Sequence, residues 1–219
     1  MRRLDLCACL LLHTFGCARP TVTNEAPPLV WNVDNLKSIG GHVLSVEGAP
    51  RVLETGAVAF DGVDDGIEVP ALPLAGAGAF TIEIVFRPDT DGPPEQRFLH
   101  LQEDASPSRF LIETRVRPAG TWYLDTYIHT ELDNCTLVDP QKAHPTGVWH
   151  AAALSYDGRT MRHYVNGREE MSRELKFRPL THGRTSIGMR INRVHWFKGA
   201  VRTVRFTPRA LPPSELLRP

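Results

Sequence analysis

The sequence has too few cysteines to be a disulfide-stapled protein. It contains 4 cysteines in 219 residues, and Cys7, Cys9 and Cys17 all lie near its start. Cys135 therefore has no partner within the body of the chain, and a zinc site built on several cysteines is excluded there. A chain of this length can instead rely on one hydrophobic core.

The sequence also lacks an excess of charge of either sign. Its 25 basic and 25 acidic side chains give a formal net charge of zero, which argues against a nucleic-acid partner because such proteins need a basic surface. No apolar run approaches the roughly 20 residues of a membrane-spanning helix. We therefore expect contact with a membrane only through a lipid anchor.

The first residues have the layout of an export signal. Met1–Arg3 is basic, an apolar run includes Leu10–Leu12, and small residues follow at Gly16–Ala18. This layout predicts a signal peptide over 1–17 and a flexible linker over 18–28. Thr14-Phe15-Gly16-Cys17 resembles a bacterial lipobox, although a leucine is expected where Thr14 stands. We predict an exported protein that is either secreted or a cell-envelope lipoprotein lipidated on Cys17.

The body of the chain alternates apolar and polar residues with the period of a β-strand. In 79–88, for example, Ile82, Ile84 and Phe86 share one side, as in a half-buried strand. Asp157-Gly158 and Asn166-Gly167 are hairpin-turn dipeptides, so 148–175 reads as an antiparallel meander. One short helix is expected at 211–216. The predicted strands are 43–46, 57–60, 66–69, 79–88, 110–117, 122–130, 149–156, 161–165, 184–191 and 199–206. Many short strands separated by turns predict an all-β sandwich or jelly roll.

Three segments carry a family pattern in a fixed order. They are Phe60–Pro70 running into Phe80–Glu83, then Gly147–His150 through to Tyr164–Gly167, and finally Ile187-Gly188 through Phe197–Gly199 to Arg209–Leu211. In this order they resemble the laminin-G-like branch of the concanavalin A-like lectin/glucanase superfamily. The resemblance implies a two-sheet antiparallel jelly-roll sandwich over 29–217. It also implies a non-catalytic module that binds carbohydrate or protein ligands.

Some members of the superfamily that the chain resembles hydrolyse β-glucans. They place two glutamates and an aspartate on one strand, where one carboxylate attacks and another donates a proton. Glu131-Leu132-Asp133 begins such a pattern, but Asn134-Cys135-Thr136 follows and the last acid is missing. We therefore predict no enzymatic activity, and an atypical glycoside hydrolase is the less favoured alternative.

Three aspartates in a glycine-flanked turn are the candidate metal ligands. Asp61, Asp64 and Asp65 offer the hard oxygens that Ca²⁺ prefers, and related jelly rolls often carry such an ion. The alternative is a solvated turn in which aspartate and glycine only provide turn geometry. The strand after Phe197–Gly199 has Arg202-Thr203 where the family usually has Asp-Glu, which weakens a charge-based site.

The polar sides of the middle strands form the candidate binding surface. They collect Glu83, Glu113, Arg115, Arg117, Tyr123, Asp125, Tyr127 and His129, and the loop 189–196 would wall this surface. Our ligand-binding candidates are Arg115, Tyr127, His129, Arg190 and Trp196, because sugars are held by aromatic rings and planar polar groups. Arginine-rich content would suit an anionic sugar or an acidic protein. The alternative is an ordinary solvated sheet face, with Trp196 filling the core. Trp122 and Trp149 follow the apolar alternation, so we expect both in the core.

The sequence thus predicts an exported, non-catalytic carbohydrate-binding module. Its partner would be a glycan or a cell-surface or extracellular protein. A protein-interaction module on the same fold remains the main alternative, since the sequence names no ligand.

Overall fold

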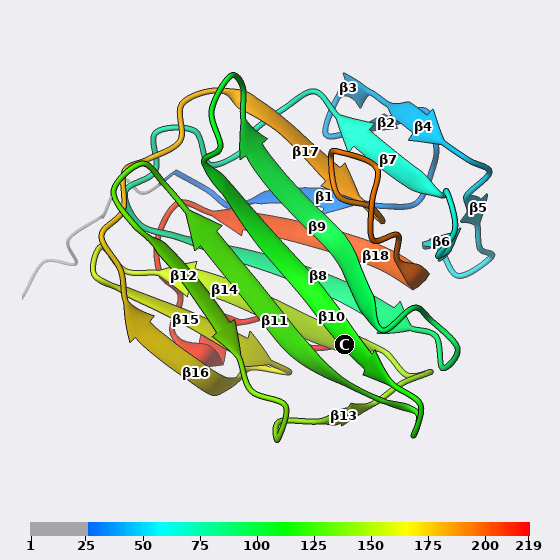
Figure 1. Ribbon diagram of the computed structural model, residues 1–219. Helices are drawn as coiled ribbons and strands as arrows, with labels where there is room; N and C mark the ends of the chain where they lie inside the picture. The colour runs from blue at the N-terminus through cyan, green and yellow to red at the C-terminus, as the bar shows by residue number, and fades with distance from the viewer. Residues whose placement is uncertain (1–25) are drawn as a thin grey trace, which may run out of the picture.

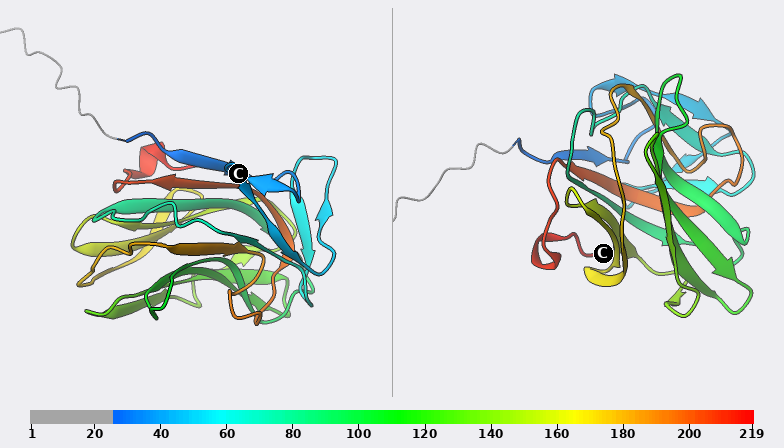
Figure 2. Two further views of the ribbon diagram at one scale, coloured as in Figure 1. Left: turned by 90° about the horizontal axis from the view of Figure 1, so that it is seen from above. Right: turned by 60° about the vertical axis from the view of Figure 1, so that its left-hand side comes forward.

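Two large antiparallel sheets lie face to face in the structure, a computed structural model that describes residues 26–219. Figure 1 shows one sheet in front of the other, and Figure 2 shows the two layers from above. We call them the front sheet and the rear sheet. The predicted signal segment, Cys17 and most of the predicted linker lie outside the described residues. Within 26–219 no helix is long and apolar enough to cross a membrane.

The front sheet has the strand order β12-β11-β10-β9-β17-β7-β4, and β13 also pairs with β11. Its strands, in chain order, are β4 (Ser45–Glu47), β7 (Gly66–Val69), β9 (Glu95–Glu103), β10 (Arg109–Arg117), β11 (Thr121–His129), β12 (Asn134–Val138), β13 (His144–Pro145) and β17 (Gly183–Ile187). A separate two-stranded ribbon is formed by β2 (Ser38–Ile39) and β3 (His42–Val43).

The rear sheet has the order β16-β15-β14-β8-β18-β6-β5, with β1 paired to β18. Its strands are β1 (Leu29–Asn32), β5 (Arg51–Val52), β6 (Val58–Asp61), β8 (Phe80–Pro88), β14 (His150–Tyr156), β15 (Thr160–Val165), β16 (Arg168–Glu174) and β18 (Lys198–Thr207). The chain ends with a single 3₁₀ turn, η1 (Pro213–Glu215).

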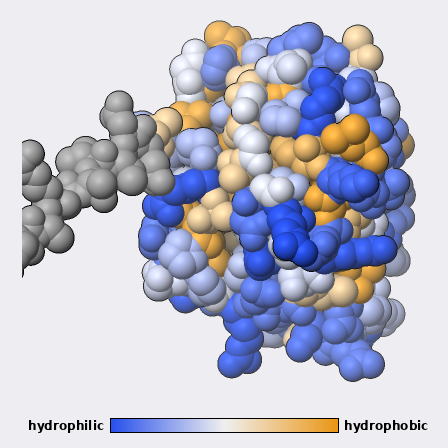
Figure 3. Space-filling model, turned by 90° about the vertical axis from the view of Figure 1, so that its left-hand side faces the viewer, coloured by the Kyte–Doolittle hydropathy of each residue, from blue (hydrophilic) through white to orange (hydrophobic). Residues whose placement is uncertain are grey.

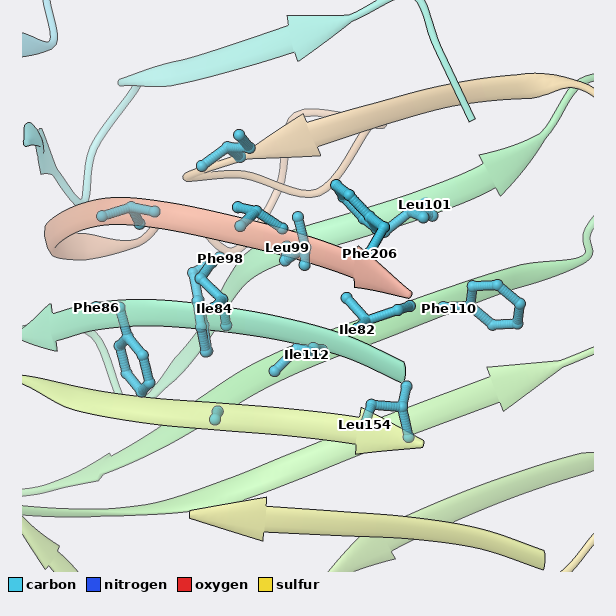
Figure 4. Packing of buried hydrophobic residues seen from close by; sticks show 14 of the residues in the cluster. Ile82, Ile84, Phe86, Phe98, Leu99, Leu101, Phe110, Ile112, Leu154 and Phe206 are labelled. Carbon is cyan, nitrogen blue, oxygen red and sulfur yellow. The ribbon is translucent and has the colours of Figure 1, made fainter. Parts of the chain in front are cut away.

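The core lies between the sheets and is built from the apolar side of each alternating strand. Ile84 and Phe86 of β8 face Phe98 and Ile112 of the front sheet (Figure 4). The rings of Phe86 and Phe98 stack with centroids 4.3 Å apart. Each such buried side chain stabilises the fold by roughly 1.5–3 kcal/mol relative to its exposed state. The hydrophobic contacts between the sheets therefore fix which strand faces are left for solvent.

The C-terminal segment covers part of the outer face of the rear sheet. Leu211 and Leu216 form a second apolar cluster with Ala153 and Tyr164. The hydroxyl of Thr81 donates to the Arg209 carbonyl over 2.9 Å. β8 is therefore enclosed on both faces, and all but one of its residues are buried.

The two-sheet all-β prediction is confirmed, and so is the hairpin meander. Asn166 and Gly167 both take positive φ, 49° and 71°, in the tight turn between β15 and β16. The predicted strand 43–46 is wrong as one element, because it is split between β3 and β4. The predicted strand 184–191 ends at Ile187, and the predicted helix is only the 3₁₀ turn.

Two sequence interpretations of packing need correction. Trp149 is not a core residue; it is half-buried, with the guanidinium groups of Arg87 and Arg202 5.8 and 5.0 Å from its ring centre. Glu83 does not share a face with the acids of the middle strands, because β8 belongs to the rear sheet. Trp122 is fully buried, as expected.

Candidate ligand-binding site

The outer face of the front sheet carries charged side chains at its centre. β10 pairs with β9 on one side and β11 on the other, and the register sets Glu113 opposite both Arg97 and Asp125. Since neighbouring positions on one sheet face lie about 5 Å apart, these side chains meet. The same alternation that sends Phe110 and Ile112 into the core therefore assembles a charged cluster on the outside.

Ion pairs between these side chains hold them in position. Arg97 Nε donates to Glu113 Oε1 over 2.5 Å, and Arg115 Nε donates to Asp125 Oδ2 over 2.9 Å. Glu95 accepts from both guanidinium groups. Glu113 and Asp125 have side chains only 4 % exposed. The network fixes planar hydrogen-bonding groups in defined orientations before any ligand arrives.

A hollow of about 210 Å³ opens over this network. It is lined by Arg97, Arg109, Leu111, Glu113, Arg115, Asp125, Tyr127, Thr136 and Arg190. The guanidinium of Arg109 lies 5.0 Å from the centre of the Tyr127 ring, in the range of a cation–π contact. The lining thus combines four guanidinium groups, two carboxylates and one aromatic ring.

The loop from β17 to β18 brings Arg190 to the hollow and is tightly held (Figure 1). It begins at Gly188, whose φ is +82° and where a Cβ would lie 2.4 Å from the Phe60 ring. Ile191 N–H donates to His100 Nδ1 over 3.0 Å, and Arg97 N–H donates to the His195 carbonyl over 2.8 Å. These bonds tie the loop to β9, so Arg190 is presented by a braced segment.

Burial and crowding shift the titration of several groups around the hollow. Burial, and then the neighbouring Asp125, raise the pKa of Glu113 to about 7 against the opposing effect of Arg97. Burial lowers the pKa of His100 to about 3, so its Nδ1 is an acceptor at neutral pH. Burial and the charges of Arg109 and Arg97 lower the pKa of Arg190. The arginines are therefore closer together than their own charges favour.

The structure places three of the five predicted ligand residues together. Arg115, Tyr127 and Arg190 line the hollow, whereas His129 and Trp196 do not. His129 is the next outward residue on β11; its ring centre lies 6.1 Å from that of Tyr127, and its Nδ1 is 3.0 Å from the Pro107 carbonyl oxygen. Trp196 is half-buried in the β17–β18 loop.

Arg97 is a charged site residue that sequence reasoning missed. It belongs to β9, which was not predicted because a bulge opposite Ile112 and Glu113 interrupts the alternation. Phe98 and Leu99 are consequently both buried, although they are adjacent. The signal that remained was the charged pair Glu95 and Arg97, which comes directly before this apolar doublet.

Larger hollows lie elsewhere among the described residues, and two of them contain a charged pair. One of about 510 Å³ includes Arg159 and Glu174, which bond to each other at 2.7 Å. The other, of about 550 Å³, includes His144 and Glu170, whose Nε2 and Oε1 are 2.8 Å apart. We take the front-sheet hollow as the candidate site because two of its four arginines, Arg109 and Arg190, form no ion pair with a described residue.

The predicted Glu131–Asp133 acids do not assemble beside the hollow. They lie in the turn before β12, where Glu131 pairs with Arg178 at 3.2 Å. Asp133 Oδ2 accepts from the Lys176 N–H over 3.4 Å. Neither residue lines the front-sheet hollow.

The three predicted metal ligands do come together at the turn between β6 and β7. Carboxylate oxygens of Asp61, Asp64 and Asp65 all lie within 4.8 Å of one another. Asp65 accepts backbone N–H bonds through both oxygens, from Ala49 at 2.6 Å and Asp61 at 3.0 Å, and burial raises its pKa. Asp64 accepts no such bond among the described residues. The cluster could hold a metal ion, with water completing the coordination.

A family model described as the concanavalin A-like lectin/glucanases superfamily matches residues 61–217. The chain belongs to this superfamily. The match includes the strands of both sheets from β7 onward and the β17–β18 loop that carries Arg190. Among curated proteins, none matches the sequence.

Solved structures of the superfamily's fold are similar to this chain at low sequence identity. Domain 4 of AbnA, a GH43 extracellular arabinanase from Geobacillus stearothermophilus, in complex with arabinotriose, is 18 % identical with a TM-score of 0.56; the match covers 89 % of this chain and 88 % of that one. The receptor-binding domain of a botulinum neurotoxin C/D mosaic is 13 % identical with a TM-score of 0.63, over 86 % of this chain and 49 % of that one. A SAP-like pentraxin from Limulus polyphemus is 16 % identical with a TM-score of 0.58, over 72 % and 77 %. These similarities show the fold that the chain shares.

Proposed function

We propose that this protein is an exported, non-catalytic carbohydrate-binding module that holds its ligand in the front-sheet hollow. The observation that carries the proposal is the open hollow, in which planar charged groups surround a tyrosine ring. Sugar recognition needs an aromatic surface for C–H groups and planar polar groups for hydroxyls. The proposed export rests on the predicted signal peptide. The exported protein would be either secreted or anchored to the cell envelope by a lipid on Cys17.

Tyr127 and the arginines would contact different parts of the sugar. The Tyr127 ring is half-buried at the hollow, so one part of it is available to a sugar ring. The guanidinium groups can donate in pairs to oxygens, and carboxylates can accept from hydroxyls. Because internal ion pairs already orient these groups, little side-chain freedom is lost on binding.

The structural neighbours support the proposal by analogy. Domain 4 of AbnA is in complex with arabinotriose, and a related toxin structure describes interaction with two ganglioside molecules. The match covers 49 % of that toxin chain and 88 % of the AbnA domain, so the AbnA domain is the closer analogy for a glycan on this fold. The identity of this chain's ligand has to be inferred from the residues that line its own hollow.

A pair of tyrosines on one strand provides the test. Tyr127 lines the hollow, while Tyr123 lies outside its lining and carries the guanidinium of Arg117 4.9 Å from its ring centre. After a glycan array identifies a ligand, we expect Tyr127→Ala to weaken binding about tenfold or more in calorimetry, and Tyr123→Ala to leave it unchanged. Both variants should keep the thermal unfolding midpoint near that of the parent. Equal loss in the two variants, or none in Tyr127→Ala, would remove the hollow as the site.

Glycoside hydrolysis is a second candidate because Glu113 combines a raised pKa with a neighbouring Asp125. Such a pair can act as acid and base. Against this, Glu113 accepts from Arg97 and Asp125 accepts from Arg115, so both acids are engaged in holding arginines. Release of reducing ends from a polysaccharide panel, lost in Glu113→Gln, would decide for the enzyme.

A protein-interaction module has less support on the face that Figure 3 displays. Hydrophobic patches there are interleaved with hydrophilic residues (Figure 3). Stable protein interfaces usually have a more continuous apolar centre. This face therefore gives no support to a protein partner over a glycan.

We also propose Ca²⁺ as the ion for the aspartate turn. Asp61, Asp64 and Asp65 would supply hard oxygen ligands at the turn that connects a rear-sheet strand to a front-sheet strand. The ion would brace this connection. It would not contact the sugar, because none of the three aspartates lines the hollow.

A further inference from the structure

Three arginines of the hollow have a buried nitrogen without a hydrogen-bond partner. They are Arg97 through Nη1, Arg109 through Nε and Arg190 through Nε. A buried donor that loses water without gaining a partner destabilises the folded state, and a charged donor does so more strongly. The ion pair of Arg97 with Glu113 and the hydrogen bond of Arg109 to the Pro107 carbonyl use other nitrogen atoms, so they leave these donors unsatisfied.

The hollow also keeps one unpartnered acceptor. Asp125 Oδ1 is buried without a hydrogen bond, while its Oδ2 binds Arg115. Buried polar atoms in folded proteins nearly always have a partner. The hollow therefore presents an excess of cationic donors together with a single acceptor suited to a hydroxyl group.

We propose that the hollow binds a carboxylate-bearing sugar residue of an acidic glycan, such as a uronate. This inference rests on the proposed function and narrows its ligand. The sugar carboxylate accepts from the guanidinium groups of Arg97, Arg109 and Arg190, whose planar forks match it. A ring hydroxyl donates to Asp125 Oδ1, and the Tyr127 ring contacts the sugar face.

The charge of the lining favours an anion. Four guanidinium groups face Glu113 and Asp125 in the hollow, and Glu95 beside them adds a third carboxylate. The local sum is 4 − 3 = +1 with all three acids ionised, in a chain whose formal net charge is zero. A ligand carboxylate would neutralise this excess.

The size of the hollow favours one sugar residue over an acidic peptide. Its volume of about 210 Å³ corresponds to roughly seven water molecules at about 30 Å³ each. That space holds a single ring with its substituents. A peptide would place only one acidic side chain there. It would leave Asp125 Oδ1, which can accept a hydrogen bond from a sugar hydroxyl, without a partner.

Oligouronates and their methyl esters provide the decisive comparison. Esterification removes the negative charge and keeps the sugar, so calorimetry on the two forms isolates the carboxylate. With the full chain we expect at least about tenfold tighter binding of the acid than of its ester, for one of trigalacturonate, triglucuronate or trimannuronate. Arg190→Gln should abolish this preference, and Arg109→Gln should reduce it.

Arg193→Gln is the matched control on the same loop. Its guanidinium bonds to Glu47, and it does not line the hollow, so the acid preference should survive. Thermal unfolding must show that all variants remain folded. Equal affinity for acid and ester, or a preference that persists in Arg190→Gln, would overturn the inference while leaving glycan binding intact.

Two further outcomes separate this inference from the proposed function. Binding of polyglutamate or of sulfated oligosaccharides as tightly as the oligouronates would show a general anion site and would refute the uronate assignment. Failure to bind any acidic or neutral glycan on the array would refute the proposed function itself.

Discussion

The outer faces of the two sheets contain the same kind of ion pair in opposite settings. On the rear sheet, Glu83 is 1 % exposed and receives two hydrogen bonds from Arg205, through Nε and Nη2. The Leu217 N–H donates to Glu83 as well, over 2.7 Å, from the C-terminal segment that covers this face. On the front sheet, Glu113 binds Arg97 in a similar way, but the pair lies in an open hollow.

The difference lies in what each pair leaves unsatisfied. The side chains of Glu83 and Arg205 contain no unpartnered buried nitrogen or oxygen, whereas Arg97 and Asp125 each keep one. A sealed and fully bonded ion pair has a structural role, since breaking it leaves a buried charge. An ion pair in an open hollow that keeps unpartnered donor and acceptor atoms can use those atoms to hydrogen-bond a ligand. We infer that function belongs to the front face.

The largest effect should come from breaking the sealed pair. Glu83→Gln leaves Arg205 largely buried and without its charged partner, and we expect a loss of about 3–5 kcal/mol in the free energy of unfolding. Urea denaturation would measure it. Glu113→Gln is the counterpart on the open face.

The loss in Glu113→Gln should be below about 1.5 kcal/mol for two reasons. Arg97 retains Glu95 at 3.3 Å, and the substitution removes the repulsion between Glu113 and Asp125. Similar losses in the two variants would contradict the distinction between the faces.

An intermediate effect is expected from pH on the open face. The pKa of Glu113 is raised to about 7, so this carboxyl is mostly ionised at pH 8 and mostly protonated at pH 6. A ligand uronate stays ionised at both values, since such carboxyls titrate near pH 3–4. Affinity for an acidic glycan should therefore rise by up to about tenfold from pH 8 to pH 6.

Other groups around Glu113 must not account for this trend. Those that face it are Arg97 from β9, Arg115 from β10, Asp125 from β11 and Arg190 from the β17–β18 loop. The arginines stay charged across this range. Glu113→Gln should abolish the pH dependence in calorimetry; tighter binding at pH 8, or an unchanged profile in this variant, would contradict the assignment to Glu113.

The contrast between the faces was only partly predictable from sequence. Alternation correctly assigned the outward side of β10 and β11, because neither strand is interrupted. It could not assign Glu83 to the other sheet, since alternation sets which face a side chain takes within a strand and not which strands are neighbours. It also missed Arg97, because the bulge in β9 turns two adjacent residues inward. The cover on the rear face depends on contacts such as Leu217 to Glu83, 134 residues apart, which no local pattern reports.

The smallest expected effect is at the aspartate turn, which connects the two sheets. Ca²⁺ at several times its dissociation constant should stabilise the protein by about 1 kcal/mol, a rise of about 2–4 °C in the unfolding midpoint for a domain of this size. Asp64→Asn should abolish the rise, because Asp64 is the one cluster carboxylate with no backbone hydrogen bond among the described residues. Asp104→Asn, an exposed aspartate outside the cluster, is the charge-matched control and should keep it.

Glycan affinity should be the same with Ca²⁺ and with a chelator, since the aspartate turn does not line the hollow. A chelator-sensitive affinity would mean that the ion helps to shape the open face, and the separation between a braced scaffold and a binding surface would then fail. A midpoint that rises equally in Asp64→Asn would instead show that Ca²⁺ acts elsewhere on the chain. If glycan affinity is unchanged by the chelator and Asp64→Asn loses the thermal shift, the aspartate turn has a structural role and no role in binding. The sealed ion pair of the rear face has the same kind of role.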